Sequence, residues 1–482
     1  METSTTPTSK RGQSPKVLAL IFVGAIVVTV TITALLINIF ERKQEGHASF
    51  APVVQIDETV VDPAVWGQNF PSQYEAFLRT AEFTESAHGG VMVPHDVEGD
   101  PRTEVPSSKL EEDPRLVDMW LGYPFAVDYR HARGHEYMIL DQQFTLRNTE
   151  FNQPGTCLNC HASTPSMYTA LGDGDRQAGF LAMGTISLDD AIELAEHPVS
   201  CIDCHDPETM ALRITRPAFA AGIAELKALE GVEDYEVNRD ATRQEMRSYV
   251  CAQCHVEYYF AGEDKVLEFP WEKGLDIDDI WDHYQDVGHV DWVHERTGAE
   301  MLKAQHPEFD IWAQGVHAKN GVSCVDCHMA YEREGAVKVT NHHITTPLAD
   351  INASCGTCHT TGDGVLADRV TTIQDRFIES RDRSLDALVF LIGDIETAIA
   401  EGTPEEYIDL AREYQNKASF YIDYVYSENS YGFHAPDYIQ RILSQALDAA
   451  RLGQLALTGV PAEDLQPSVT TVNNLNASLR SQ

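Results

Sequence analysis

The pattern Cys-x-x-Cys-His occurs five times in this chain of 482 residues, and the five copies use all ten of its cysteines. In chain order the copies are Cys157/Cys160/His161, Cys201/Cys204/His205, Cys251/Cys254/His255, Cys324/Cys327/His328 and Cys355/Cys358/His359. Ten cysteines and 19 histidines in a chain of this length would produce one such motif by chance in about one chain in a hundred. Five copies are therefore not accidental, and the chain must fold around whatever they bind.

The motif is typical of covalent c-type haem attachment, in which two thiols add to the haem vinyl groups and the adjacent histidine binds the iron. Zinc sites and disulfides are the alternatives. Zinc would need second ligand pairs at compatible spacing, and disulfides would not require a histidine after every second cysteine. We therefore predict five covalently bound haem c groups, held by motifs too unevenly spaced to form a tandem array.

Acidic side chains dominate the charge of the chain, since 35 Lys and Arg face 75 Asp and Glu and give a formal net charge of −40. A nucleic-acid partner requires a basic face for its phosphates, so we exclude general nucleic-acid binding. We expect a well-solvated acidic surface. An anionic substrate would need a local basic patch against this background field.

The segment Val17 to Phe40 contains no charged residue over 24 positions. At about 1.5 Å per residue, a helix of this length crosses a bilayer. We predict a transmembrane anchor over residues 17–40 and a cytoplasmic tail over residues 1–16, because three basic residues precede the apolar segment. The alternative is a cleaved signal peptide, whose apolar region is normally shorter and ends in a small-residue cleavage site.

Composition changes after the fifth motif. Residues 41–362 hold all the cysteines, whereas residues 363–466 hold none and carry long apolar-periodic segments; residues 467–482 form a tail. The periodicity predicts one or two amphipathic helices over Val370 to Ala400, with Ser384 off the apolar stripe. Further helices are expected up to about Ser427 and over about Pro436 to Leu457. The predicted fold class is mainly α.

The start of the middle C-terminal helix carries a recognisable signal. Thr403, Pro404 and Glu406 are expected to supply an N-cap, a first-turn proline and a capping-box acid. Such long helices pack against each other or against a second subunit, and the sequence leaves both possibilities open.

Several separate strings between about Trp66 and His434 form a specific set. They are YPFAVDYRHARGHEY, FTLRN ahead of the first motif, CAQCHVEYYF at the third, MLKAQHPEFDIWAQGVH before the fourth, TNHHITTP before the fifth, and YGFHAP in the C-terminal region. Together they resemble the pentahaem cytochrome c nitrite reductases of the ammonia-forming type. The resemblance implies a multihaem cytochrome c body, a homodimer formed through residues 363–466, and six-electron reduction of nitrite to ammonium.

The resemblance places the catalytic haem at the first motif, with Arg147, Tyr258 and His306 on its open face. Arg147 offers a permanently charged fork for an anion. His306 can donate hydrogen bonds to substrate oxygens and pass protons, and Tyr258 adds a phenolic donor. A surface arginine, a core tyrosine and a histidine at the Pro307 turn are the alternative readings.

A calcium site next to this haem is also implied by the resemblance. Its expected ligands are the Glu257 carboxylate, the carbonyls of Tyr258 and Lys303, and the Gln305 amide. These are hard oxygen donors, as calcium requires. The alternative is a solvated Glu257 and a Gln305 that hydrogen bonds near a helix start.

Fourteen histidines lie outside the motifs, enough to supply sixth ligands for saturated, electron-transferring haems. By resemblance, His342 serves the second motif, His135 the third, His434 the fourth and His317 the fifth, which leaves the first iron open. His343 is the rival of His342. The other histidines that we assign to the surface or core are His47, His88, His95, His131, His197, His283, His289 and His294.

The first motif departs from the best-known pattern of the family, in which lysine follows the second cysteine, because His161 stands there. An imidazole should alter the potential of the iron and its preference for substrate. We therefore predict a nitrite reductase on the periplasmic face of the membrane, fed by a quinol-oxidising membrane cytochrome, with hydroxylamine and sulfite as substrates to test. The alternatives are an electron-transfer cytochrome without catalysis and hydroxylamine oxidation, which the motif count disfavours.

Overall fold

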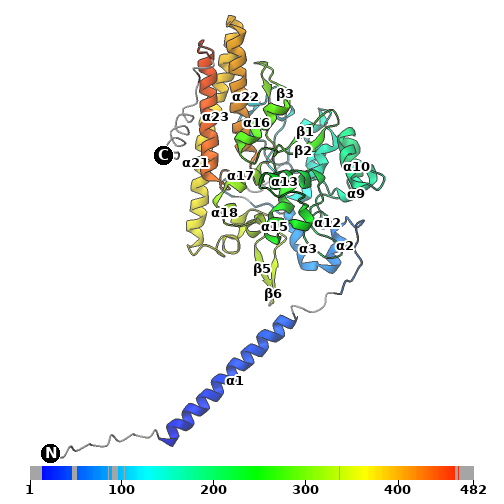
Figure 1. The fold of residues 1–482 in the computed structure, drawn as a ribbon, viewed down its shortest axis with the longest axis vertical. Coiled ribbons are helices and arrows are strands. Elements are labelled where there is room, and N and C mark those ends of the chain that lie inside the picture. Colours follow the sequence, from blue (N-terminus) through cyan, green and yellow to red (C-terminus); the bar gives the residue numbers. More distant parts are fainter. Residues whose placement is uncertain are drawn as a thin grey trace, which may run out of the picture. The chain divides into compact units, whose positions relative to one another are not determined.

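The structure is a computed structural model that describes residues 14–45, 51–84, 86–89, 96–102, 104–335, 337–461 and 465. The chain divides into two compact units, Met1–Pro52 with Glu332–Val339 and Val53–Tyr331 with Thr340–Gln482. Helices dominate the larger unit, which confirms the predicted fold class (Figure 1). The predicted tail over 467–482 and most of the tail over 1–16 lie outside the described residues, as do His47 and His95.

Helix α1 spans Pro15–Glu45 and contains the predicted apolar segment. Its part Pro15–Phe40, 26 residues, is long and apolar enough by length and composition to cross a membrane. Such a helix measures about 39 Å, more than the ~30 Å hydrocarbon core of a bilayer. A membrane anchor and a signal sequence share these properties, so the helix is confirmed and its role stays a prediction.

Short helices build most of the larger unit before residue 355. The α-helices are α2 (Pro63–Asn69), α3 (Pro71–Leu78), α4 (Lys109–Glu112), α5 (Arg115–Met119), α6 (Met138–Phe144), α7 (Leu146–Thr149), α8 (Leu158–His161), α9 (Pro165–Leu171), α10 (Arg176–Ala182), α11 (Leu188–Leu194), α12 (Cys201–Cys204), α13 (Pro217–Leu229), α14 (Val237–Asp240), α15 (Arg243–Ala252), α16 (Ile277–Val287), α17 (Glu308–Gln314), α18 (Val316–Lys319), α19 (Cys324–His328) and α20 (Ile351–Ser354). Short 3₁₀ helices connect them: η1 (Arg79–Ala81), η2 (Pro124–Ala126), η3 (His135–Tyr137), η4 (Gly155–Cys157), η5 (Met183–Thr185) and η6 (Pro347–Asp350).

Polar N-caps explain where many of these helices begin. The side chains of Asp62, Asp175, Thr242 and Asp276 each accept a backbone N–H bond in the first turn that follows. An N-cap acceptor satisfies a helical N–H that has no partner inside the helix. Short helices that start at fixed residues suit a body whose shape must match rigid cofactors.

Strands are few and pair only as antiparallel ribbons or two-stranded sheets. Strand β1 (Tyr259–Ala261) pairs with β2 (Val266–Glu268), and β3 (Trp292–Val293) pairs with β4 (Glu300–Met301). A third two-stranded sheet consists of β5 (Tyr331–Glu334) and β6 (Val337–Thr340). The first two ribbons lie in sequence directly beside the residues predicted to surround the first haem.

Three long helices, α21 (Asp363–Glu401), α22 (Glu405–Ser427) and α23 (Pro436–Ala456), run side by side (Figure 1). Helix α21 is continuous over 39 residues, so the first predicted segment is one helix. Ser384 was wrongly placed off its apolar stripe: the side chain is 2% exposed, and its hydroxyl donates to the carbonyl of Leu443 at 3.0 Å. A small hydroxyl side chain thus lets α21 approach α23 closely.

The predicted capping box of α22 is wrong. The N-cap is Pro404, which has no side-chain acceptor, and Glu405 is the first helical residue. Pro404 therefore ends the connection from α21 through its fixed backbone angle. Thr403 does not cap the helix.

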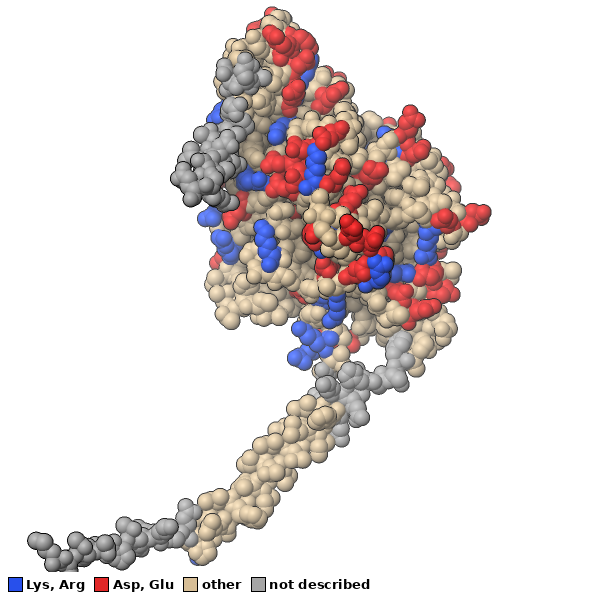
Figure 2. Space-filling model, in the orientation of Figure 1, with Lys and Arg blue, Asp and Glu red and all other residues tan. Residues whose placement is uncertain are grey.

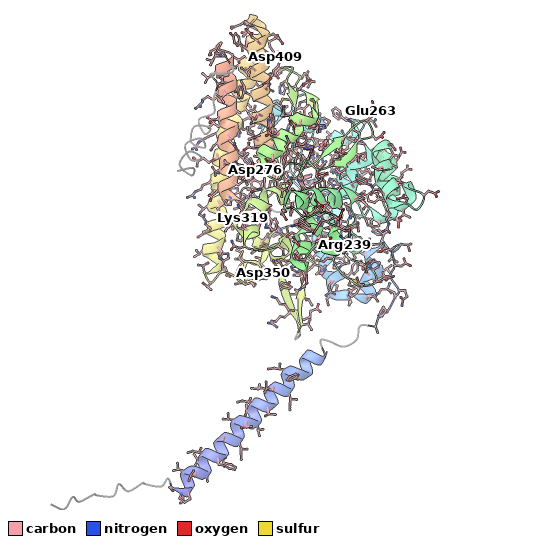
Figure 3. The ribbon with its side chains drawn as sticks, in the orientation of Figure 1. Arg239, Glu263, Asp276, Lys319, Asp350 and Asp409 are labelled. Carbon is pink, nitrogen blue, oxygen red and sulfur yellow. The ribbon has the colours of Figure 1, made fainter. Side chains whose placement is uncertain are left out.

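Two apolar clusters form the core of the larger unit. One joins α16 and the three long helices around residues such as Trp120 and Phe420, and the other surrounds the first three motifs with residues such as Trp271 and Phe309. Asp276, labelled in Figure 3, accepts two bonds of 2.7 Å from Arg441 of α23, which ties α16 to the long helices. The haem motifs therefore lie against a rigid helical support.

Acidic residues outnumber basic ones on the visible face of the larger unit, as the sequence predicts (Figure 2). The red side chains are dispersed over several elements, with blue ones between them. This face therefore shows no large basic patch that could attract an anion.

Candidate active site

Aspartates inside two of the motifs fix the local helix that presents the cysteines. In α12 the carboxylate of Asp203 accepts the backbone N–H of Ser200, and in α19 Asp326 accepts that of Ser323, both at 2.8 Å. Each aspartate also meets a buried arginine: Arg216 lies 2.5 Å from Asp203 and Arg247 lies 2.6 Å from Asp326. The segment Ser-Cys-x-Asp-Cys-His thus forms an N-capped helical turn. An arginine from another element pairs with its aspartate and stabilises the turn.

The motifs lie close together in space. None of the ten cysteines forms a disulfide, so all ten are available for haem attachment. The side chain of Cys160 lies next to that of Cys254, and the side chain of Cys251 lies next to that of Cys324. The third motif is therefore in direct contact with both the first and the fourth, an arrangement suited to closely packed haems.

The fifth motif differs from the others in its exposure. Cys358, which we predict to bind haem, is exposed, whereas the other nine cysteines are buried or partly buried. The adjacent His359 is exposed as well, because α20 ends at Ser354 and the motif continues in the turn that precedes α21. A covalent thioether does not require burial of the cysteine, so haem attachment at Cys358 stays a prediction for a site at the surface.

Eight histidines form four facing pairs, and they are the pairs that the family resemblance assigns. The ring centres of His205 and His342 are 6.2 Å apart, those of His255 and His135 6.2 Å, those of His328 and His434 6.3 Å, and those of His359 and His317 6.4 Å. In each pair one ring comes from a motif and the other from a distant part of the chain. It is His342, and not His343, that faces His205.

These separations test whether the residues fit a haem iron. Metal–imidazole bonds of about 2 Å, with about 1.1 Å from each nitrogen to its ring centre, place two rings about 6.2 Å apart across one metal. All four pairs match this separation, and each has two cysteine thiols beside it in sequence. The residues therefore fit bis-histidine haems.

His161 of the first motif differs from the other four motif histidines. Within the described part of the chain, no ring contact pairs it with a second histidine, and its ring nitrogens lie 3.3 and 3.5 Å from the side-chain amide of Gln142. Burial lowers the pKa of His161 to about 3, with further contributions from His306 and Arg147. The ring is thus neutral at ordinary pH and available as a metal ligand.

Arg147 of α7 and His306 before α17 lie near His161, and Tyr258 before β1 lies near Arg147 and the two cysteines of the first motif. Arg147 acts electrostatically on His161, Tyr258 and His306, so the three predicted side chains share one region. Among the described residues, none of their side chains makes a hydrogen bond or ion pair, although each is partly buried. Three polar ends without protein partners can serve a small polar ligand.

Burial sets the charge states of these three groups. It lowers the pKa of His306 to about 4 and lowers the pKa of Arg147, and it raises the pKa of Tyr258 well above its ordinary value. His306 is therefore a neutral imidazole at ordinary pH, Tyr258 a phenol, and Arg147 the permanent positive charge of the group. The Arg147 guanidinium also lies 5.0 Å from the Phe125 ring centre, which holds it without neutralising it.

The four oxygen donors predicted for calcium lie in one network. The hydroxyl of Tyr284 donates to the Glu257 carboxylate at 2.9 Å and to the Tyr258 carbonyl at 3.3 Å. Glu257 also accepts the backbone N–H of Gln305 at 2.7 Å, and the Gln305 amide lies 3.3 Å from the Lys303 carbonyl. Glu257 is 0% exposed, and burial raises its pKa well above the ordinary value.

These donors fit a hard cation better than a transition metal. Among the described residues there is no group of three or more His, Cys, Asp or Glu that could hold a metal ion. A carboxylate, two carbonyls and an amide are the donor set that calcium uses, with water completing its shell.

The sequence did not reveal several residues that contact the predicted ligands. Gln142 lies beside His161, Glu308 lies 3.8 Å from Nδ1 of His255, and Glu428 lies 2.6 Å from Nδ1 of His434. Glu308 stands inside the string that carries the resemblance, two residues after His306, yet its spacing gave no reason to assign it to another motif. Glu428 follows α22, and no sequence pattern indicated a role for it.

Comparison with known proteins agrees with this geometry. Residues 62–476 match the family of cytochrome c552. This chain belongs to the cytochrome c552 family. Cytochrome c-552 of Bacteroides fragilis is 35% identical over 455 residues, which cover 92% of this chain and 86% of the relative. Another relative is the cytochrome c nitrite reductase subunit NrfA of Nitratidesulfovibrio vulgaris, 34% identical over 424 residues, or 80% of this chain and 78% of that protein.

A solved structure of the same kind extends the similarity to the fold. The catalytic subunit NrfA of the Desulfovibrio desulfuricans cytochrome c nitrite reductase, described for its two calcium sites, superposes with a TM-score of 0.73 at 29% identity. The match covers 87% of this cytochrome c552 family member and 91% of that chain.

Proposed function

We propose that this cytochrome c552 family member is a nitrite reductase that converts nitrite to ammonium. One observation carries the proposal: four motif histidines each face a second imidazole, whereas His161 faces none among the described residues, and three polar side chains near the first motif have no hydrogen-bond or ion-pair partner among them. A chain built only for electron transfer would be expected to pair all five.

The chain's own residues would bind and orient the anion. Haem c held at Cys157, Cys160 and His161 would supply electrons and an open coordination position. Arg147 attracts nitrite into a strongly acidic protein and holds its oxygens by charge-assisted bonds. Because Arg147 has no carboxylate partner among the described residues, its charge is available to the substrate.

Proton supply falls to His306 and Tyr258. Reduction of nitrite to ammonium takes up six electrons and eight protons and releases two waters, so proton delivery limits the chemistry as much as electron delivery. His306 carries a proton to an oxygen that leaves as water, and Tyr258 donates a hydrogen bond that holds that oxygen. Because its imidazole is neutral, His306 would act as a relay, in which one ring nitrogen gives up its proton while the other takes one from solvent, and the residue is partly exposed.

The four histidine pairs form the electron path to this site. The residues that would hold four further haems are His205/His342, His255/His135, His328/His434 and His359/His317, and these haems would carry electrons without binding substrate. The contact between Cys160 and Cys254 makes the third motif the immediate donor to the first. His161 in place of lysine changes the donor to the catalytic iron, so the rates with hydroxylamine and sulfite should be measured beside that with nitrite.

The test uses the purified protein with all five haems attached. We expect a high-spin ferric signal from one haem in five, which changes when nitrite is added, together with ammonium formation from nitrite and a reduced viologen dye. Five low-spin haems that do not respond to nitrite would instead support the alternative, an electron-transfer cytochrome.

We also propose that Glu257, Tyr258, Lys303 and Gln305 hold calcium. The cation would replace the Tyr284 hydroxyl at the Glu257 carboxylate and fix the backbone that joins Tyr258 to the site. Tyr258 and His306 would then be positioned by one ion, because their neighbours Glu257 and Gln305 are both ligands.

Replacing Glu257 with glutamine is expected to remove calcium and lower nitrite turnover by about 10-fold or more, since it removes the one charged ligand. Calcium content by elemental analysis and turnover with and without chelator check this. Glu268→Gln is the matched control. Glu268 accepts a hydrogen bond from the hydroxyl of Tyr259, which stands two residues after Glu257, and Glu268 is not one of the proposed ligands. Full activity after complete removal of calcium would contradict the site.

Partners and location follow from the same assignment. We propose that α1 anchors the protein with its catalytic unit on the periplasmic side, where c-type haems are attached, and that a quinol-oxidising membrane cytochrome supplies electrons. We further propose a homodimer through the long helices, whose surface carries apolar side chains such as Phe390, 68% exposed, and Leu447, 41% exposed.

A further inference from the structure

The second ring nitrogen of an iron-bound histidine carries a proton and needs an acceptor, and the acceptors differ among the paired histidines. Three of these Nδ1 atoms meet backbone carbonyls: His205 meets Met210 at 3.0 Å, His328 meets Thr345 at 3.0 Å, and His342 meets Thr340 at 2.9 Å. Both ligands assigned to the second motif's haem therefore have neutral acceptors. That haem is an internal reference for the others.

Two of the paired histidines face carboxylates instead. Nδ1 of His434 lies 2.6 Å from Oε1 of Glu428, whose side chain is 0% exposed. Nδ1 of His255 lies 3.8 Å from Oε2 of Glu308, whose side chain is 12% exposed. Oε2 of Glu308 is buried and has no hydrogen-bond partner among the described residues, so it is free to accept the His255 N–H.

The two carboxylates are held by one short segment that follows α22. The side-chain amide of Asn429 donates to Oε1 of Glu308 at 2.6 Å, which leaves Oε2 directed toward His255. The next residue, Ser430, donates its backbone N–H and its hydroxyl to Glu428 at 3.0 and 2.8 Å. Adjacent residues thus orient both glutamates toward different histidines.

No basic side chain offsets these charges directly. Within the described part of the chain, neither Glu308 nor Glu428 forms an ion pair with a lysine or arginine, and their only ionic contacts are the two histidines. A negative charge in a buried place acts strongly on a neighbouring metal centre, because solvent screens it little.

We propose that Glu308 and Glu428 place negative charges beside Nδ1 of His255 and His434, in ionic contact rather than in hydrogen-bond geometry, and thereby lower the reduction potentials of the haems at the third and fourth motifs. The inference rests on the proposed haem ligation. An anionic acceptor makes the imidazole a stronger donor and favours the ferric over the ferrous state, whereas a backbone carbonyl does so less. The haem at the second motif should consequently titrate at a higher potential.

This arrangement gives the electron path a direction. The third motif touches the first through Cys160 and Cys254, and the fourth touches the third through Cys251 and Cys324. Two haems of lowered potential would therefore stand in line before the catalytic haem. Electrons that leave them toward the first motif would have a larger driving force than they would without the two carboxylates.

The test compares Glu308→Gln and Glu428→Gln with Glu308→Asp and Glu428→Asp, all in the full-length protein with its haems. Optical redox titration and low-spin electron paramagnetic resonance report the midpoints and axial ligation. We expect each glutamine variant to raise one midpoint, a different one in each case, with about a tenfold change in the ratio of reduced to oxidised haem at fixed potential, or about 60 mV for one electron. The aspartate variants, which keep the charge, should recover much of that shift.

Glu379→Gln is the control for loss of one negative charge, since Glu379 is 63% exposed on α21 and its one ion pair within the described residues is with Arg383. Unchanged midpoints in both glutamine variants at full haem content would overturn the proposal, and so would a uniform shift of all five haems equal to that of the control. Haem count and nitrite reduction by the unmodified protein test the proposed function separately, so that its failure is distinguishable from failure of this inference.

Discussion

Replacing His306 with asparagine is expected to lower the turnover number for nitrite by about 10²–10⁴-fold while all five haems stay attached. Asparagine keeps a hydrogen-bond donor at this position but cannot carry a proton to a leaving oxygen. His306 makes no side-chain hydrogen bond to a described residue, so its loss should leave the fold intact. Ammonium formation, measured beside haem content by the pyridine haemochrome method, checks the prediction.

A histidine away from the site provides the control. His131 contacts Glu112 at 2.8 Å on another part of the larger unit, and His131→Asn should leave turnover within about twofold of the unmodified protein. A parallel loss of haem and turnover in His306→Asn would make His306 structural. Undiminished turnover at full haem content would remove it from the chemistry.

Much of the fold could be predicted because the motifs and helix signals are local. Apolar periodicity predicted the three long helices, and only the finer signals misled. Ser384 is polar but lies buried against α23, where its hydroxyl donates a hydrogen bond to the carbonyl of Leu443. Thr403 looked like a cap, yet Pro404 takes the N-cap position. Both errors concern contacts that a single segment does not encode.

The candidate site could be predicted only as far as the family strings reach. The structure brings together the histidine pairs that the resemblance names, and their roles as ligands stay predictions. Periodicity and spacing alone did not pair His434 with His328, because more than a hundred residues separate them. Nor could they reveal Glu428 or Gln142, which matter through position in space rather than through any motif. The exposure of Cys358 was equally hidden, since all five motifs read alike in the sequence.

The buried Arg216 links the first two motifs, and the sequence did not predict this role either. The residues beside Arg216, which caps the start of α13, give no indication that this side chain is buried. Its guanidinium donates to the carbonyls of Asn159 and Ala162, at 3.1 and 2.9 Å, and lies 2.5 Å from Asp203. The two carbonyls flank His161, and Asp203 lies between the cysteines of the second motif. One side chain therefore fixes two motifs relative to each other.

Replacing Arg216 with methionine is consequently expected to lower the free energy of unfolding by about 3–5 kcal/mol, since it leaves the fully buried Asp203 charge unpaired. It also releases both carbonyls beside His161. We expect the high-spin signal of the first haem to broaden or disappear while the low-spin haems that do not touch Arg216 keep their spectra. Guanidinium unfolding and electron paramagnetic resonance of the haem-loaded variant measure the two effects.

Arg213→Met separates this role from the general loss of an arginine. Arg213 stands three residues earlier; it pairs with Glu58, whose side chain is 44% exposed, and donates to the Ile202 carbonyl of the second motif, but it makes none of the bonds of Arg216 to Asp203, Asn159 or Ala162. Because solvent screens such a pair, its loss should cost no more than about 1 kcal/mol and leave the high-spin signal unchanged. Equal destabilisation by the two substitutions would mean that burial of the charge pair does not distinguish Arg216. A stable Arg216→Met protein with normal high-spin haem would show that the first motif holds its geometry without this arginine.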